Sequence, residues 1–179
     1  MSNKQRLAGL GILLILQLAF PLFFIYQKER IHEVGQEYQF AIEPVDPYDF
    51  FQGKYVSLNT SPLEYTEKPT EHFQRKDIVY AQFEQKKSGV EITGISKKKT
   101  KNSLKLVVTK KLPHGKLFFR MPFTRFYTEE SKAREIEQKI AQMQDTTDTK
   151  AFVHVKVYKG DFVITDISRN GRSLIEQTP

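Results

Sequence analysis

The chain has 179 residues, with 28 Lys or Arg, 21 Asp or Glu and a formal net charge of +7. Its apolar content of 39%, including 14 Phe and 8 Tyr, favours a folded domain and excludes a disordered polar tail. The complete lack of cysteine excludes a cysteine nucleophile and is compatible with a domain outside the cytoplasm.

The first predicted element is an apolar segment, residues 7–26, in which Gln17 is the one polar side chain and no residue is charged. A helix of that length spans roughly 30 Å, the thickness of a bilayer's hydrocarbon core. A cleaved signal peptide is the alternative, but its apolar region is usually about 7–15 residues and ends at small residues. Residues 20–26 are bulky, so we expect an uncleaved, single-pass membrane anchor preceded by a short flank, residues 1–6.

The flanking charges predict the orientation of this anchor. Lys4, Arg6 and the free amine precede it, whereas Lys28 and Arg30 follow it. Three positive groups against two favour a cytoplasmic N-terminus. We therefore expect a cell-membrane protein whose C-terminal domain, residues 37–179, lies outside the cytoplasm.

Between anchor and domain, residues 27–36 form a juxtamembrane segment in which we expect a short helix. Beyond it, apolar and polar residues alternate in most segments, which is typical of half-buried strands, and Gly-containing turns at residues 87–89 and 159–161 predict two hairpins. The predicted strands are residues 37–42, 54–59, 78–83, 90–95, 104–108, 117–119, 151–158 and 162–168.

One segment, residues 129–143, has helical periodicity instead, with Thr128 as the expected N-cap. The apolar residues that share its predicted face are Ala133, Ile136, Ile140 and Met143. The predicted fold is therefore α+β: a mainly antiparallel β domain with one amphipathic helix, preceded by a single N-terminal transmembrane helix.

A cluster of turn residues precedes the second predicted strand. Asp46 and Asp49 lie among prolines and can bond nearby backbone amides, and Gly53 allows a positive φ just before the strand. The two aspartates could also act as a metal-binding or acid/base pair, but no histidine is near them in sequence and paired turn aspartates are usually structural.

At these residues the chain resembles the GDYXXLXY family of small bacterial membrane-anchored proteins, whose signature has the form D-P-x-D-x-x-x-G-D-Y-x-x-L-x-Y. It departs from that signature at Lys54, which stands where an Asp belongs, and at Thr60, which stands where a Tyr belongs. The matching positions are Asp46, Pro47, Asp49, Gly53, Tyr55 and Leu58.

A second stretch, residues 125–137, resembles the family's R-Y-F-x-x-E-G-x-x-R-E-I-E pattern and includes Arg125 and Glu130. The closing residues 170–172 also resemble the end of the family. The resemblance implies a membrane-anchored protein but assigns no activity. We expect the motif residues to bind a partner, and we expect Tyr55 to bury its ring in the core with its hydroxyl hydrogen-bonded.

The charge is concentrated in residues 86–125, which hold twelve Lys or Arg and one acid, Glu91. Such a patch attracts polyanions, which outside a bacterial membrane are anionic lipids or wall polymers such as teichoic acids. We expect no nucleic acid there. The alternative is a solvated loop that protects an edge strand. The densest part, expected at a hairpin tip, is Lys97, Lys98, Lys99 and Lys101.

Catalytic patterns are not apparent in the sequence. The four histidines have no metal-binding spacing, and His154 is expected to be a structural or surface residue. No P-loop or dinucleotide fingerprint predicts a cofactor. The favoured hypothesis is a non-catalytic accessory protein that docks a membrane or envelope partner, for example an integral membrane protein. The alternative is an envelope enzyme using Asp46, Asp49 and Glu130, which requires carboxylates about 5–9.5 Å apart.

Overall fold

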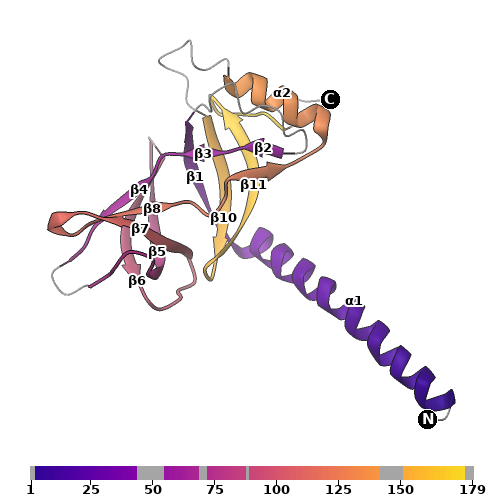
Figure 1. The fold of residues 1–179 in the computed structure, drawn as a ribbon. Coiled ribbons are helices and arrows are strands. Elements are labelled where there is room, and N and C mark those ends of the chain that lie inside the picture. Colours follow the sequence, from indigo (N-terminus) through magenta and orange to yellow (C-terminus); the bar gives the residue numbers. More distant parts are fainter. Residues whose placement is uncertain (1–2, 44–54, 69–71, 88, 142–150, 176–179) are drawn as a thin grey trace.

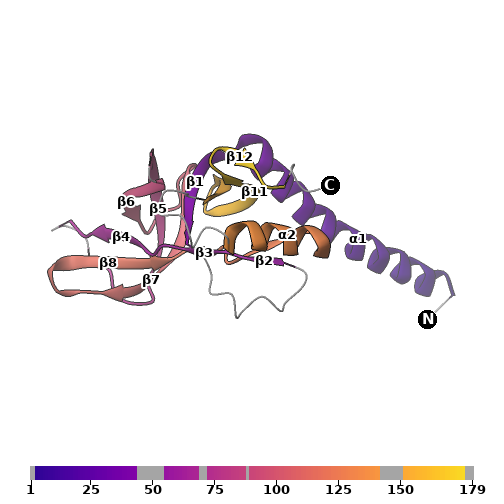
Figure 2. The ribbon, with the colours of Figure 1, turned by 90° about the horizontal axis from the view of Figure 1, so that it is seen from above.

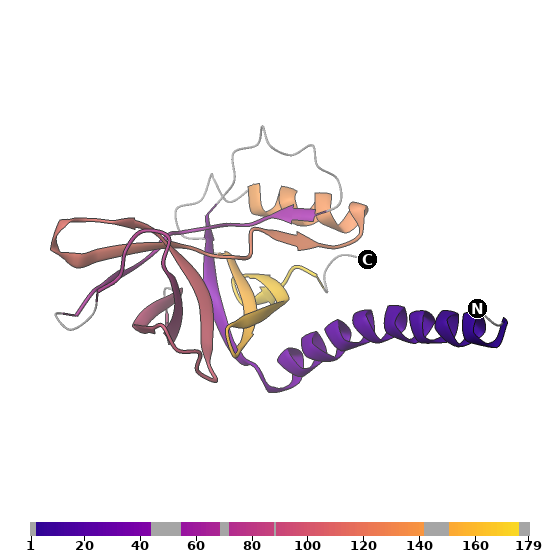
Figure 3. The same cartoon turned by 60° about the horizontal axis from the view of Figure 1, so that its bottom comes forward.

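The computed structural model describes residues 3–43, 55–68, 72–87, 89–141 and 151–175 as one long helix attached to a β-rich body (Figure 1). The body is mostly antiparallel sheet with one further α-helix, α2, so the predicted fold class is confirmed. The helix α1 runs away from the body, and its C-terminal end leads directly into β1 (Figure 3).

Helix α1 spans Asn3–Val34, 32 residues, and continues through Pro21 without interruption. The expected juxtamembrane helix is therefore the last part of α1 and not a separate element. Gly9–Val34 is long and apolar enough to cross a membrane, and its most apolar stretch is not covered by the rest of the described chain. The side chains of Leu10 to Tyr26 are exposed, as expected of a helix that contacts lipid.

The first sheet carries the N- and C-terminal strands side by side. The predicted hairpin of residues 151–168 is confirmed, and its turn at Lys159 and Gly160 has positive φ at both residues, as a two-residue hairpin turn needs. In sheet order its strands are β12 (Arg172–Ser173), β11 (Asp161–Arg169), β10 (Ala151–Tyr158), β1 (Gln36–Glu43) and β3 (Asn59–Thr60).

The second sheet contains the other predicted hairpin, formed by β5 and β6. Strands β6 and β7 both pair with β5, so the connection between them crosses the end of β5 and is not a hairpin. In sheet order the strands are β4 (Leu63–Thr66), β8 (Lys116–Arg120), β7 (Ser103–Lys111), β5 (Ile78–Lys86) and β6 (Gly89–Ser96); a short 3-10 turn, Pro113–Gly115, joins β7 to β8.

Aromatic side chains join the two sheets in one core. Phe40 of β1 lies 4.9 Å from Phe123 and 5.5 Å from Phe83 of β5 between ring centroids, and all three residues are buried. Phe123 in turn lies 5.4 Å from Phe162 of β11. Edge-to-face packing of this kind adds to the free energy of burial, so this cluster holds the sheets together.

A small third layer is formed by β2 (Tyr55–Ser57), β9 (Arg125–Tyr127) and α2 (Glu130–Ala141), with α2 alongside β2 (Figure 2). The predicted apolar face of α2 is confirmed for Ala133, Ile136 and Ile140, which are at most 4% exposed; Met143 lies outside the described residues. The first helical hydrogen bond runs from the Ala133 amide to the Glu129 carbonyl, one residue after the expected cap.

Candidate functional site

The motif residues fall into two groups. Asp46, Asp49 and Gly53 lie outside the described residues, so the carboxylate separation that the enzyme hypothesis requires stays a prediction. The other motif residues are Tyr55, Leu58, Arg125 and Glu130; of these, Glu130 is the first residue of α2.

The two stretches that resemble the family pair with each other in space. Strands β2 and β9 are antiparallel, with Tyr55 opposite Tyr127 and Ser57 opposite Arg125. The Arg125 guanidinium lies 4.6 Å from the centre of the Tyr55 ring, and the two tyrosine rings are 5.7 Å apart. We call Tyr55, Arg125 and Tyr127 the β2–β9 cluster.

This cluster lies at the surface, above two core residues of the same motif. Val56 and Leu58 are 0% and 3% exposed, whereas Tyr55 is half-buried and Tyr127 is 68% exposed. The expected burial of the Tyr55 ring in the core is therefore wrong. Successive strand residues face opposite sides, and because Val56 faces the core, Tyr55 faces the surface cluster.

The chemistry of the cluster is that of a recognition surface. The side-chain hydrogen bond with Tyr127, together with the nearby Tyr55, raises the pKa of Arg125, which stays positively charged at all physiological pH values. A guanidinium that lies over the Tyr55 ring and is hydrogen-bonded to Tyr127 presents planar donors and apolar area together. Arg and Tyr are the residue types that most often dominate binding energy at protein interfaces.

A sequence model of the GDYXXLXY protein family matches residues 17–167, which is most of the chain and includes both stretches of the cluster. The chain belongs to this family. Among the curated proteins and among the solved structures, none matches significantly. Both stretches lie within the matched region, and each supplies one strand of the β2–β9 pair.

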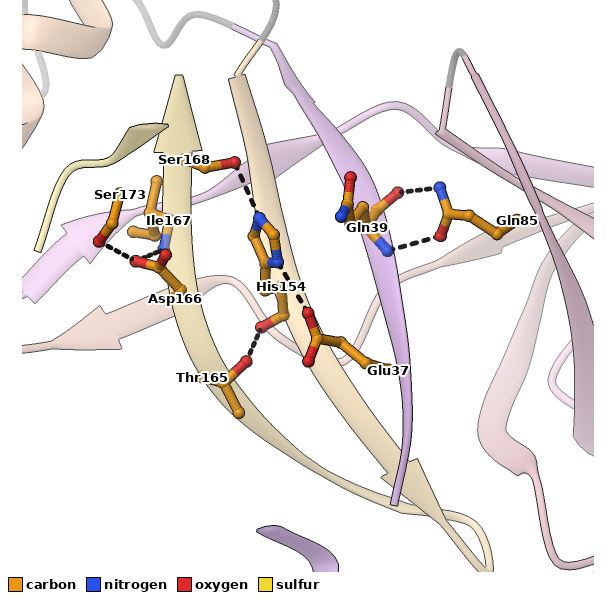
Figure 4. A network of polar contacts seen from close by, with 9 residues as sticks. All are labelled: Glu37, Gln39, Gln85, His154, Thr165, Asp166, Ile167, Ser168 and Ser173. Carbon is orange, nitrogen blue, oxygen red and sulfur yellow. Dashed lines mark hydrogen bonds and ion pairs between the residues drawn. The ribbon is translucent and has the colours of Figure 1, made fainter. Parts of the chain in front are cut away.

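A polar network across the outer face of the first sheet was not predicted from the sequence (Figure 4). His154 of β10 lies at its centre: Nε2 is 2.8 Å from the Ser168 Oγ, and Nδ1 is 2.9 Å from a Glu37 carboxylate oxygen. Asp166 accepts a hydrogen bond from Ser173 at 2.8 Å nearby. The surrounding hollow has a volume of about 420 Å³.

The order hydroxyl, imidazole, carboxylate is also that of a serine hydrolase triad. Here, however, Ser168 is 6% exposed and lies within a regular strand, paired with Phe152 on one side and Ser173 on the other. The network therefore links three adjacent strands, which agrees with the structural role expected for His154. Alternation along β10 indicates the face of His154, but no local pattern indicates its partners on β1 and β11.

The densest lysines of the predicted basic patch, Lys97, Lys98, Lys99 and Lys101, are exposed on the loop that crosses from β6 to β7. The expected hairpin tip is wrong, because β5 separates the two strands. The loop is tightly held: the buried Ser103 Oγ contacts both the Thr100 amide and the Thr100 carbonyl at 3.0 and 2.9 Å. The Lys159 amide donates to the Lys101 carbonyl at 2.8 Å, which places this loop beside the β10–β11 turn.

Within the residues that the structure describes, no group of His, Asp or Glu side chains could hold a metal ion. The described part of the chain thus offers two surfaces for recognition, the β2–β9 cluster and the basic loop, and one hydrogen-bonded network on the outer face of the first sheet.

Proposed function

We propose that this protein is a membrane-anchored accessory protein whose β domain lies outside the cytoplasm and docks an integral membrane protein through the β2–β9 cluster. The observation that carries the proposal is the meeting of the two family stretches on one exposed surface, with Arg125 stacked on Tyr55 at 4.6 Å. Within this motif, Val56 and Leu58 are buried and support the core. The exposed residues of the motif are therefore better suited to contact with a partner.

The attachment of α1 to the body supports a partner in the same membrane. Ile31 of α1 is 4% exposed against the sheet, and Lys28 forms an ion pair with Asp161 at 2.9 Å. Lys156 donates to the His32 carbonyl at 2.6 Å. These contacts attach the last turns of α1 to the first sheet, which supports a partner that lies close to the same membrane.

The test compares two arginine variants of the full chain. Arg125→Ala removes the cation of the cluster, and Arg120→Ala removes an exposed arginine from β8. After mild solubilisation of membranes, we expect co-purifying membrane proteins to be lost from Arg125→Ala but retained by Arg120→Ala. Identical co-purifying proteins for both variants and the wild type would contradict docking at the cluster.

The proposed orientation has a separate test. A reporter fused after Pro179 that is active only outside the cytoplasm should give signal, and a cytoplasm-specific reporter at the same place should give none. The opposite result would reverse the orientation. Carbonate extraction should leave the full chain in the membrane fraction, because a helix of this length and apolarity buries enough surface to resist it.

A hydrolase acting on envelope material is the second candidate, favoured by the contacts of His154 with Ser168 and Glu37. If this network activates the serine, a fluorophosphonate probe should label the wild type and leave Ser168→Ala unlabelled. If the wild type is not labelled, the network does not activate Ser168 and its role is structural. The separate hypothesis based on Asp46, Asp49 and Glu130 would be tested by the triple Asn/Asn/Gln variant against envelope substrates.

A further inference from the structure

The structure contains a hollow of about 290 Å³ where α1 leaves the β-rich body. Three separate segments form it: the last turns of α1, the loop between β6 and β7, and the turn between β10 and β11. The residues that matter for its chemistry are Phe23, Tyr26, Arg30, Lys99, Tyr158 and Lys159. We call this hollow the junction groove.

The groove is held together by contacts within the fold. The Gly160 amide donates to the Ser103 carbonyl at 2.6 Å, and the Lys105 amide donates back to the Gly160 carbonyl at 3.2 Å. Gly160 has φ +79°, and a Cβ there would lie 2.7 Å from the Tyr80 ring and 3.1 Å from the Lys99 side chain. The close approach that Gly160 permits brings Lys99 to the groove.

Positive charge exceeds negative charge in the groove. Arg30, Lys99 and Lys159 contribute three cations, whereas Asp161 contributes one carboxylate, which already accepts a hydrogen bond from Lys28 at 2.9 Å. The ring of Tyr158 lies 6.0 Å from the Arg30 guanidinium and 5.4 Å from the Lys159 ammonium, so it contacts two of the cations. Groups with this charge and donor capacity favour a phosphate.

The other wall of the groove is apolar and belongs to the membrane helix. Phe23 and Tyr26 are 58% and 62% exposed and lie at the end of the apolar run that starts near Leu10. An aromatic residue followed by cations is the arrangement found where a transmembrane helix passes through lipid headgroups. The groove therefore has a cationic side towards the body and an apolar side towards the hydrocarbon region.

We propose that the junction groove binds the headgroup of an anionic phospholipid, with the phosphate among Arg30, Lys99 and Lys159 and the acyl chains along Phe23 and Tyr26. The apolar wall selects a lipid over a soluble phosphate, because only a lipid has chains to bury there. This inference goes beyond docking of a protein partner, which depends on the β2–β9 cluster and stands whether or not the groove binds lipid.

The experiment uses the full chain in a neutral detergent, titrated with phosphatidylglycerol or with phosphatidylcholine, and counts bound lipids by native mass spectrometry. Two charge-matched variants are compared with the wild type. The groove variant is Arg30→Gln/Lys99→Gln/Lys159→Gln. The control variant is Lys97→Gln/Lys98→Gln/Lys101→Gln, which removes the same charge from exposed loop lysines that do not line the groove.

We expect the wild type to prefer phosphatidylglycerol and the groove variant to bind it at least about tenfold more weakly, because this variant lacks three cations near the headgroup. The control variant should keep most of the affinity. Equal loss in both variants would show general attraction to a basic surface and overturn the groove. Equal binding of both lipids by the wild type would also overturn it.

A second arm identifies the source of the phosphate. Glycerophosphoglycerol carries the same phosphodiester headgroup without acyl chains, so it should displace phosphatidylglycerol only at concentrations far above those of the lipid. Displacement at comparable concentrations would show that the ligand is a soluble phosphate and overturn the lipid assignment. Far-UV circular dichroism of both variants, with the same spectrum as the wild type, confirms that lost binding reflects lost contacts.

Discussion

Two surfaces of this protein use the same chemistry, a cation against a tyrosine ring, in different surroundings. In the junction groove, Arg30 of α1 and Lys159 of the β10–β11 turn lie over Tyr158, next to the apolar part of α1. In the β2–β9 cluster, Arg125 lies over Tyr55 on strands of three residues, of which β2 packs beside α2. The comparison teaches that surroundings, and not the cation–aromatic contact alone, decide which ligand such a surface suits.

The largest expected effect on stability distinguishes a core residue of the motif, Leu58, from a surface residue of the same motif, Tyr55. Leu58→Ala should lower the free energy of unfolding by about 2–5 kcal/mol, because Leu58 is 3% exposed and its truncation leaves a cavity. Tyr55→Ala should cost well under half of that, because its ring is only half-buried. Urea unfolding of the full chain in detergent measures both. An equal loss of unfolding free energy in the two variants would show that Tyr55 belongs to the core.

The next effect tests the turn that supports the junction groove. Gly160→Ala should cost about 2–4 kcal/mol, since φ is +79° and the new Cβ would overlap Tyr80. Gly171→Ala is the matched control, because Gly171 has nearly the same φ, +76°, but open space around its Cβ position. It should cost only the backbone strain, about 1–2 kcal/mol. Thermal unfolding of the two variants gives the difference; a smaller loss for Gly160→Ala would contradict the close packing.

The ion pair between Glu67 and Lys111, which belongs to neither the junction groove nor the β2–β9 cluster, illustrates a charge with a structural role. The Glu67 carboxylate is 8% exposed and accepts hydrogen bonds from Lys111 at 2.7 Å and from the Phe73 amide. The hydrogen bond from Lys111 is the main cause that lowers the pKa of Glu67. Glu67→Gln should therefore cost about 1–3 kcal/mol at neutral pH.

The pH dependence of this variant gives an independent check. Because the pKa of Glu67 is lower in the folded state, its contribution is complete above the unfolded value of about 4.3 and is lost as the pH falls through the folded value. The stability difference between wild type and Glu67→Gln should shrink below about pH 4. A difference that stays constant down to pH 2 would contradict the linkage.

The smallest effect concerns the ion pair that borders the junction groove. Lys28 and Asp161 have side chains 48% and 47% exposed, so Asp161→Asn should change stability by less than about 1 kcal/mol. It should, however, strengthen phosphatidylglycerol binding slightly, because it removes a negative charge from the groove lining. Loss of several kcal/mol in unfolding experiments would show that this pair supports the fold and is not available to a ligand.

Local pattern predicted the elements well because the determinants are local. Alternation predicted β1, β5, β6, β7, β8, β10 and β11, and helical spacing predicted α2 with its buried face. Two predictions were wrong, and in both cases the outcome depended on which strands pair with each other. The predicted strand of residues 54–59 is replaced by two short strands, β2 and β3, that join different sheets, and the loop between β6 and β7 crosses over β5.

The candidate sites were predicted less completely, since each combines residues from distant segments. Sequence similarity to the family drew attention to both stretches, Tyr55 and Arg125, but not to their direct contact. It gave no indication that Glu37 and Ser168 would meet His154, or that Lys99 would lie beside Arg30. Register between strands and the path of a crossover loop set these contacts, and neither leaves a local signature in the sequence.

By itself, the sequence determined that an apolar helix precedes one β-rich domain with a basic segment, because length, periodicity and charge are properties of neighbouring residues. Only the tertiary structure decided which faces these residues share. The two sheets pack together through Phe40, Phe83 and Phe123. In this arrangement the β10–β11 hairpin contacts α1, and the loop between β6 and β7 contacts the hairpin and lines the junction groove beside α1. Burial of the aromatic core requires that arrangement, and the position of each surface group follows from it.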